Sequence, residues 1–302
     1  MSDRGGAAKR ATKVVALGGG HGLAVVLRAA RLYTDDITAV VTVADDGGSS
    51  GRLRRDLGVV APGDLRKCLV ALASDPIWAQ AFEHRFQGGD LDGHAFGNLV
   101  IVGLTESLGD PLRAVSEAAK VVGAVGRVLP ATIGPVVMKA DVDGRAVEGQ
   151  VAVQNSPGRI GHVELVPADA RAPEAVIEAI AAADQVVLAP GSLFTSLLPV
   201  LSVGEIRSAL ASTAASVTQV ANLRPELPET EGLDATDHLR AVLDHGVRVD
   251  RFVFHAVGAF AADPDEIREL GVEPVPADVA GANGRVHDPA KLATALSALL
   301  ES

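Results

Sequence analysis

An apolar run that ends in a cluster of glycines constrains this chain more than any other stretch. The run is Val14–Leu17, and the next five positions are Gly18, Gly19, Gly20, His21 and Gly22. From Leu23 onward, apolar residues recur on one face of a helix. Glycines let a backbone turn sharply and approach a ligand closely, and a helix start offers unpaired N–H groups to an anion. The stretch therefore predicts a strand, a turn and a helix that bind a nucleotide or a phosphosugar.

A tight turn without a ligand is the alternative, because Leu23 stands where the dinucleotide-binding fingerprint has its third glycine. The rest of the chain favours an α/β domain, since strand and helix patterns alternate along it. Strands are expected at 13–17, 37–44, 163–166, 185–189, 217–221 and 251–255, and helices at 23–33, 173–183, 236–243 and 289–300. We therefore expect a Rossmann-like fold with a doubly wound, mostly parallel sheet.

Two insertions interrupt this alternation. Residues 64–122 are expected to be an inserted, mostly helical region that Asp64 opens as an N-cap. Asp143-Gly144 is a turn signal between two β-like runs, 136–141 and 145–153, and predicts a small β-hairpin excursion. Residues 1–12 are expected to be a disordered tail, and residues 13–302 a single nucleotide-binding domain.

Composition excludes several classes of function. The formal net charge of −11 argues against non-specific nucleic-acid binding, which needs a basic surface. The one cysteine, Cys68, excludes a disulfide framework, and its helical context predicts a buried apolar role. No secretory leader and no apolar run of membrane-spanning length are visible. These features favour a cytoplasmic protein without a membrane span.

Polar residues gather where the expected strands end, which is where ligands bind in parallel sheets. One more candidate, Asn98, follows His94 by one helical turn, so that both can face one pocket. The candidate ligand-binding residues are Gly18, Gly19, Gly20, His21, Gly22, Asp45, Asp46, Ser49, Ser50, Arg52, Asn98, Gly191, Ser192, Thr195 and Asn222. No catalytic residue is assigned, and His21 is expected to contact the ligand. His84, His238, His245 and His287 are expected at surface or cap positions.

Two of these motifs allow more than one interpretation. Asp45 and Asp46 can bind a ribose hydroxyl, hold Mg²⁺ beside a phosphate, or form a solvated loop. The stretch Gly191–Ser196 resembles a second anion-binding turn, although a plain N-cap at Ser192 explains it equally well.

Five motifs in this order resemble the YvcK family of gluconeogenesis factors, within the CofD-like superfamily. They are GGGHGL at 18–23, VTVADDGGSSGRLR at 41–54, PGDLR at 62–66, FGNL at 96–99 and PGSLFTS at 190–196. The chain departs from the family in two places. His21 stands where the glycine turn often carries threonine, and Leu223–Thr230 matches only in part a motif that reads Met-Thr-Gln-Pro-Gly-Glu-Thr.

The resemblance implies a cytoplasmic protein that binds a nucleotide sugar of the UDP-N-acetylglucosamine type. It also implies a role in cell shape and cell-wall synthesis during growth on gluconeogenic carbon sources. Cell-wall synthesis or regulatory proteins are then candidate partners, and a homodimer stays open. The alternative is a CofD-like phosphotransferase, of the 2-phospho-L-lactate transferase type with Mg²⁺, in coenzyme F420 biosynthesis. A dinucleotide-dependent oxidoreductase is disfavoured by the missing third glycine.

Overall fold

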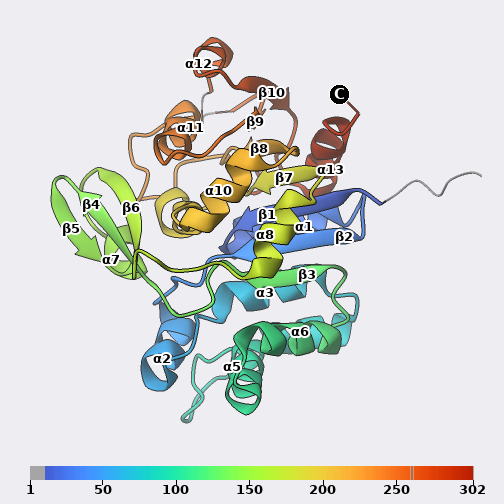
Figure 1. The fold of residues 1–302 in the computed structure, drawn as a ribbon, viewed down its shortest axis with the longest axis vertical. Coiled ribbons are helices and arrows are strands. Elements are labelled where there is room, and N and C mark those ends of the chain that lie inside the picture. Colours follow the sequence, from blue (N-terminus) through green and yellow to red (C-terminus); the bar gives the residue numbers. More distant parts are fainter. Residues whose placement is uncertain (1–10, 259, 261, 302) are drawn as a thin grey trace, which may run out of the picture.

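The computed structural model describes residues 11–258, 260 and 262–301, and its central element is a parallel sheet of seven strands (Figure 1). The strand order is β10-β9-β8-β7-β1-β2-β3, and every neighbouring pair is parallel. The strands are β1 (Lys13–Gly18), β2 (Asp36–Val41), β3 (Arg127–Pro130), β7 (Gln185–Leu188), β8 (Ser216–Val220), β9 (Arg251–His255) and β10 (Glu273–Ala277). The prediction of a Rossmann-like, mostly parallel sheet is confirmed.

The direction of winding reverses between β1 and β7. From β1 the chain adds β2 and β3 on one side, and from β7 it adds β8, β9 and β10 on the other. In parallel sheets a reversal of this kind marks the usual ligand site, at the carboxyl ends of the two strands. The glycine turn at 18–22 and the stretch 190–196 lie at these two ends.

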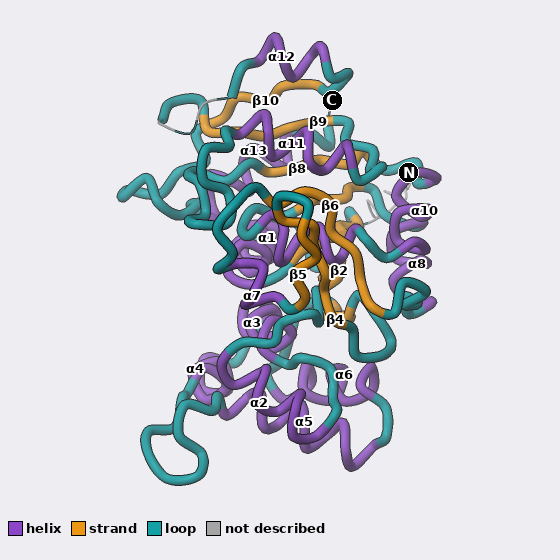
Figure 2. Tube along the Cα trace, turned by 90° about the vertical axis from the view of Figure 1, so that its left-hand side faces the viewer, coloured by secondary structure: helices purple, strands orange, loops and turns teal. Residues whose placement is uncertain are grey.

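Helices cover both faces of this sheet. Helices α8 and α10 lie on one face, and α1 lies on the other (Figure 2), where it packs against α3 and α13. The helices around the main sheet are α1 (Gly20–Ala30), α3 (Gly63–Leu72), α8 (Glu174–Ala181), α9 (Leu198–Leu201), α10 (Gly204–Ser212), α11 (Ala235–Asp244), α12 (Pro264–Glu269) and α13 (Pro289–Ala298). A π-helical turn, η1 (Leu193–Leu197), precedes α9.

The two expected insertions both form, with changed boundaries. The helical one extends below the sheet in Figure 1 and contains α2 (Gly48–Leu57), α4 (Pro76–Glu83), α5 (Phe96–Leu108) and α6 (Pro111–Val121). The β excursion is a three-stranded antiparallel sheet, in the order β5-β4-β6, with one short helix. These elements are β4 (Val137–Val142), β5 (Arg145–Glu148), β6 (Ile160–Val166) and α7 (Gln150–Gln154). Asp143 and Gly144 form the hairpin turn as predicted, with φ of 50° and 78°.

Several sequence-based boundaries need correction. The strand expected at 163–166 is part of β6, which pairs with β4 in the small sheet and is not a strand of the main sheet. The second hairpin run, expected over 145–153, ends at Glu148, because Gln150 onward forms α7. Asp64 lies inside the first turn of α3, whose N-cap is Pro62. Residues 1–10 of the expected tail lie outside the described residues, and the Thr12 carbonyl accepts a hydrogen bond from Thr34.

The expectation of surface or cap positions fails for two histidines. His238, on the buried face of α11, is 2% exposed, and His287, just before α13, is 9% exposed. Burial disfavours the charged imidazolium and lowers the pKa of each to about 4. Cys68 is fully buried as predicted, and burial raises the pKa of its thiol.

Acidification is expected to destabilise the protein through these two histidines. A pKa lowered in the folded state means that the unfolded chain binds protons first, so stability falls as the pH drops from about 6.5 toward 4. Between pH 7 and pH 5 the loss is on the order of 2 kcal/mol for each histidine. Urea unfolding of the wild type and of His238→Leu at both pH values measures this difference. An unchanged pH dependence in the variant would contradict the assignment.

Candidate functional site

A cleft of about 270 Å³ opens at the carboxyl ends of β1 and β7, at the point where the winding reverses. We call it the glycine cleft. Eight of the candidate residues line it: Gly19, Gly20, His21, Gly22, Asp45, Gly191, Ser192 and Thr195. It is also lined by Thr42, Asp64, Lys67, Gln150, Gln154, Ser196 and Glu226. The main sheet, the small sheet's α7 and the η1 turn therefore all contribute to one site.

The glycine turn is shaped by close approach to the neighbouring loop. A Cβ on Gly22 would overlap the carbonyl group of Pro190, which follows β7. Gly18, at the end of β1, has φ of 147°, and its carbonyl accepts a hydrogen bond from the Thr42 N–H. The two loops pack directly against each other, so the first turn of α1 forms the wall of the cleft.

Asp64 occupies one of the N–H groups at the N-terminus of α1, where an anion is expected to bind. Its carboxylate accepts a hydrogen bond from the Gly20 N–H at 2.8 Å and pairs with the Lys67 ammonium at 2.9 Å. Partial burial in the cleft lowers the pKa of His21, and the nearby Lys67 charge lowers it further. Lys67 and the remaining N–H groups of α1 are left as the positive side of the cleft.

Asp45 and Asp64 both line the cleft. Burial raises the pKa of Asp45, and repulsion from Asp64 adds to the rise, while hydrogen bonds from the Gly47 N–H and the Ser50 hydroxyl oppose it. A divalent cation would relieve this repulsion, because Mg²⁺ binds through one or two carboxylates and the phosphates of a ligand. One oxygen of Asp64 already accepts from the Gly20 N–H and the other pairs with Lys67, so an ion held by the two carboxylates would compete with these contacts.

Asp46 has a different task. Its two carboxylate oxygens accept hydrogen bonds from the N–H groups of Gln150 and Val151, at 3.0 and 2.9 Å, and so cap α7. The pair Asp45-Asp46 is therefore split: Asp45 lines the cleft, and Asp46 holds the small sheet's helix beside it.

Ser49, Asn98 and His94 form a cluster of their own between α2 and the start of α5. The Asn98 amide donates to the Ser49 hydroxyl at 3.0 Å, and the same hydroxyl lies 3.1 Å from Nδ1 of His94. Asn98 and His94 thus share a partner, but α5 begins at Phe96, so His94 lies before the helix and not one turn from Asn98 on it. Arg52 donates to the Asp92 carbonyl at 2.7 Å. These residues brace the α2 segment behind Asp45.

The η1 turn holds an internal anion, Glu229. Its buried carboxylate accepts hydrogen bonds from the N–H of Phe194 at 2.7 Å and from the Ser192 hydroxyl at 2.6 Å. The N–H and hydroxyl of Thr195 also donate to it, at 3.3 and 3.1 Å. Burial raises the pKa of Glu229, while these hydrogen bonds oppose the rise. Ser192 is the N-cap of this turn and accepts from the Thr195 N–H, as one of the two interpretations predicts. The donors of the turn also bind an anion, but that anion is a carboxylate of the chain itself.

A second hollow, of about 320 Å³, adjoins the glycine cleft and shares His21, Gly22, Gly191 and Glu226 with it. We call it the Asn222 hollow. The Asn222 amide holds Gly191 from both sides, accepting from its N–H at 2.7 Å and donating to its carbonyl at 2.8 Å. Two arginines, Arg224 and Arg285, also line this hollow.

Known proteins share this architecture. The family model described as 2-phospho-L-lactate transferase CofD matches residues 14–285. A "Putative gluconeogenesis factor" of Mycobacterium tuberculosis is 45% identical over 303 residues, which span 94% of this chain and 89% of that protein. The chain belongs to the YvcK branch of the CofD family. The "Gluconeogenesis factor" of Bacillus subtilis is 42% identical over 236 residues, 77% of this chain and 74% of the relative.

A solved structure agrees with the YvcK fold. The crystal structure of a UPF0052 family protein from Bacillus halodurans superposes with a TM-score of 0.91 at 36% identity, covering 96% of this chain and all of that one. In the described part of this YvcK-branch chain, no single helix is both long and apolar enough to cross a membrane.

Sequence reasoning missed three charged residues of the YvcK-type site: Asp64, Glu226 and Glu229. Asp64 was interpreted as a helix cap, because an Asp after Pro-Gly is typical of one. Glu229 left a clearer signal, since Glu229-Thr230 matches the Glu-Thr end of the motif that the chain otherwise matches only in part.

Proposed function

We propose that this protein binds a nucleotide sugar of the UDP-N-acetylglucosamine type and regulates cell shape and cell-wall synthesis during growth on gluconeogenic carbon sources. The observation that carries the proposal is that the glycine cleft and the Asn222 hollow meet at shared lining residues, a boundary called here the joint. The glycine turn and Gly191 line both, so a ligand that crosses the joint passes the first turn of α1. A nucleotide sugar has its diphosphate between two ring systems, and this arrangement offers a diphosphate site with room on either side.

The charges support the same ligand. Lys67 lines the glycine cleft, and Arg224 and Arg285 line the Asn222 hollow, so each cavity contains a cation, while the acidic Glu226 lines both. We propose that Asp45 and Asp64 hold Mg²⁺ against the diphosphate, which makes the acidic wall compatible with an anionic ligand. The relatives named gluconeogenesis factors support the link to gluconeogenic growth.

Asp45→Asn is expected to remove the effect of Mg²⁺ on binding. The amide keeps the shape of the side chain but lacks the charge that attracts the cation, so the affinity for UDP-N-acetylglucosamine with Mg²⁺ should fall about tenfold or more. Isothermal titration with and without Mg²⁺ measures this change. Asp56→Asn, an exposed change on α2, is the matched control and should behave as the wild type. Equal Mg²⁺ dependence in both variants would remove Asp45 from the site.

A CofD-like phosphotransferase is the second candidate. The name of the matching family model and the Asp45–Asp64 pair, suited to Mg²⁺, favour it. This function predicts Mg²⁺-dependent transfer of phospholactate from its nucleotide-linked form to a deazaflavin acceptor, detected by chromatography of the product. With both substrates and Mg²⁺ present, absence of product would exclude the transferase and leave the binding function standing.

A further inference from the structure

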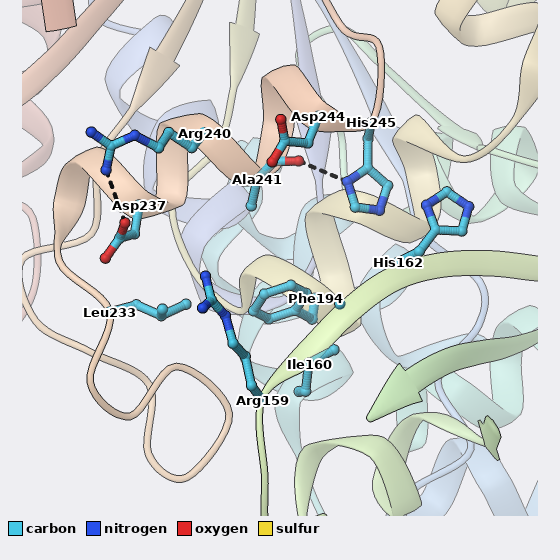
Figure 3. Close-up of a pocket in the computed structure, with 11 residues that line it drawn as sticks. Arg159, Ile160, His162, Phe194, Leu233, Asp237, Arg240, Ala241, Asp244 and His245 are labelled. Carbon is cyan, nitrogen blue, oxygen red and sulfur yellow. Dashed lines mark hydrogen bonds and ion pairs between the residues drawn. The ribbon is translucent and has the colours of Figure 1, made fainter. Parts of the chain in front are cut away.

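A third cavity lies outside the glycine cleft, between β6 of the small sheet and α11. It has a volume of about 380 Å³ and is called here the β6–α11 pocket. Figure 3 shows its walls: α11 and His245 on one side, β6 on the other, and the Phe194 ring of η1 between them. Ile160, Leu233 and Ala241 complete the apolar part of the lining. The pocket therefore offers flat and aliphatic surface to a small molecule.

Two of the three charged α11 residues that line this pocket, Asp237 and Arg240, are already paired. Arg240 donates to Asp237 at 3.1 Å and to Glu266 at 2.9 Å. The second oxygen of Asp237 accepts from the Asp234 N–H at 3.2 Å, which closes the capping box of α11. These groups hold the helix and have little capacity left for a ligand.

Arg159 differs from them. Among the residues that the structure describes, its backbone N–H donates to Asp143, but no hydrogen bond or ion pair of its guanidinium is found. Its side chain starts just before β6 and extends toward α11, and the guanidinium lies between Leu233 and Phe194 (Figure 3). An arginine head group in this position has free N–H donors beside apolar surface. That combination suits a carboxylate or phosphate attached to an apolar body.

The opposite end of the pocket is formed by two stacked imidazoles. The rings of His162 and His245 are 4.9 Å apart and inclined by 13°. His245 is fixed, because its Nδ1 donates to the Ala241 carbonyl at 2.7 Å and its Nε2 accepts from the Val163 N–H at 3.1 Å. Asp244 is exposed and lies at this histidine end, away from Arg159 (Figure 3).

From this arrangement we propose that the β6–α11 pocket is a second binding site, for a small organic anion with a flat apolar body. Arg159 binds the anionic group, and Phe194 and Leu233 contact the body. The site lies on the opposite side of η1 from the glycine cleft, since Phe194 lines the pocket while Ser192 and Thr195 line the cleft. An occupant therefore contacts the residue whose N–H holds Glu229.

Three probes of equal shape and different charge test the proposal: benzoate, benzamide and benzamidine. Each is titrated into the full-length protein, and binding is followed by the ring-proton NMR signals of His162 and His245. We expect benzoate to shift these signals saturably at millimolar concentrations and benzamide to bind more weakly. Tighter binding of benzamidine than of benzoate would overturn the proposal, because Asp244 would then dominate. No saturation by benzoate up to ~10 mM would overturn it as well.

Arg159→Gln locates the anion within the pocket. Loss of the guanidinium is expected to weaken benzoate binding about tenfold or more and to leave benzamide unchanged. Arg145→Gln, an exposed change on β5 of the same small sheet, should leave both unchanged. Benzoate binding that survives Arg159→Gln would contradict the assignment. Arg159 is exposed, so both variants should fold, and neither touches the glycine cleft, so failure here leaves the proposed function untouched.

Discussion

Gly22→Ala is expected to destabilise the protein by about 3 kcal/mol or more and to abolish ligand binding in the glycine cleft. The added Cβ would overlap the backbone carbonyl of Pro190, and neither loop can move without shifting β1 or β7. Urea unfolding monitored by circular dichroism measures the loss of stability. Titration with UDP-N-acetylglucosamine, in the fraction that stays folded, measures the loss of binding.

Gly103→Ala is the matched control, because it makes the same chemical change in the middle of α5. A Cβ at Gly103 meets no atom within 4 Å, and the position is exposed. Alanine there should stabilise the protein by about 0.5–1 kcal/mol, since glycine is unfavourable inside a helix. If Gly22→Ala proved as harmless as Gly103→Ala, the close packing of the two loops would be wrong.

Glu229→Ala is expected to cost ~3 kcal/mol or more of stability. The change removes the carboxylate that accepts from Phe194, Ser192 and Thr195, and each buried donor left unpaired costs about 1–3 kcal/mol. Glu229→Gln keeps one acceptor oxygen and should fall between the wild type and Glu229→Ala. Thermal and urea unfolding of the three proteins give the order.

Exposed Glu231 provides the control for this series. Glu231→Ala, two residues away on the surface, should change the free energy of unfolding by no more than about 0.5 kcal/mol. Equal stability of Glu229→Ala and Glu231→Ala would show that the η1 turn holds its shape without the internal anion. The turn would then be open to an external phosphate.

The sequence predicted the central strands well and the sheet edges poorly. Strands β1, β2, β7, β8 and β9 are largely buried, and the β-branched and apolar residues that dominate them are a strong local signal. The missed strands, β3 and β10, are the two edges of the main sheet. β3 has four residues, and β10 contains Pro274 and Pro276, which an edge strand tolerates but a sequence pattern counts against.

The residues of the candidate site also fall into those with a local sequence signal and those without one. The glycine turn and Asp45 follow directly from strand ends, so their place at the cleft could be read from the sequence. Asp64 reaches Gly20 across 44 residues, and Glu229 reaches Phe194 across 35, and no local spacing encodes either contact. Asp45 lines the cleft while Asp46 binds the start of α7, and this difference depends on a helix distant in the sequence that no pattern predicted.

Isothermal titration of the wild-type protein with UDP-N-acetylglucosamine tests the central claim most directly. UDP-glucose, NAD and GTP serve as comparison ligands, each with and without Mg²⁺. The account predicts saturable binding of UDP-N-acetylglucosamine that is tighter with Mg²⁺ and tighter than that of NAD or GTP. No heat with either UDP-sugar, together with Mg²⁺-dependent binding of GTP, would contradict it and favour the transferase.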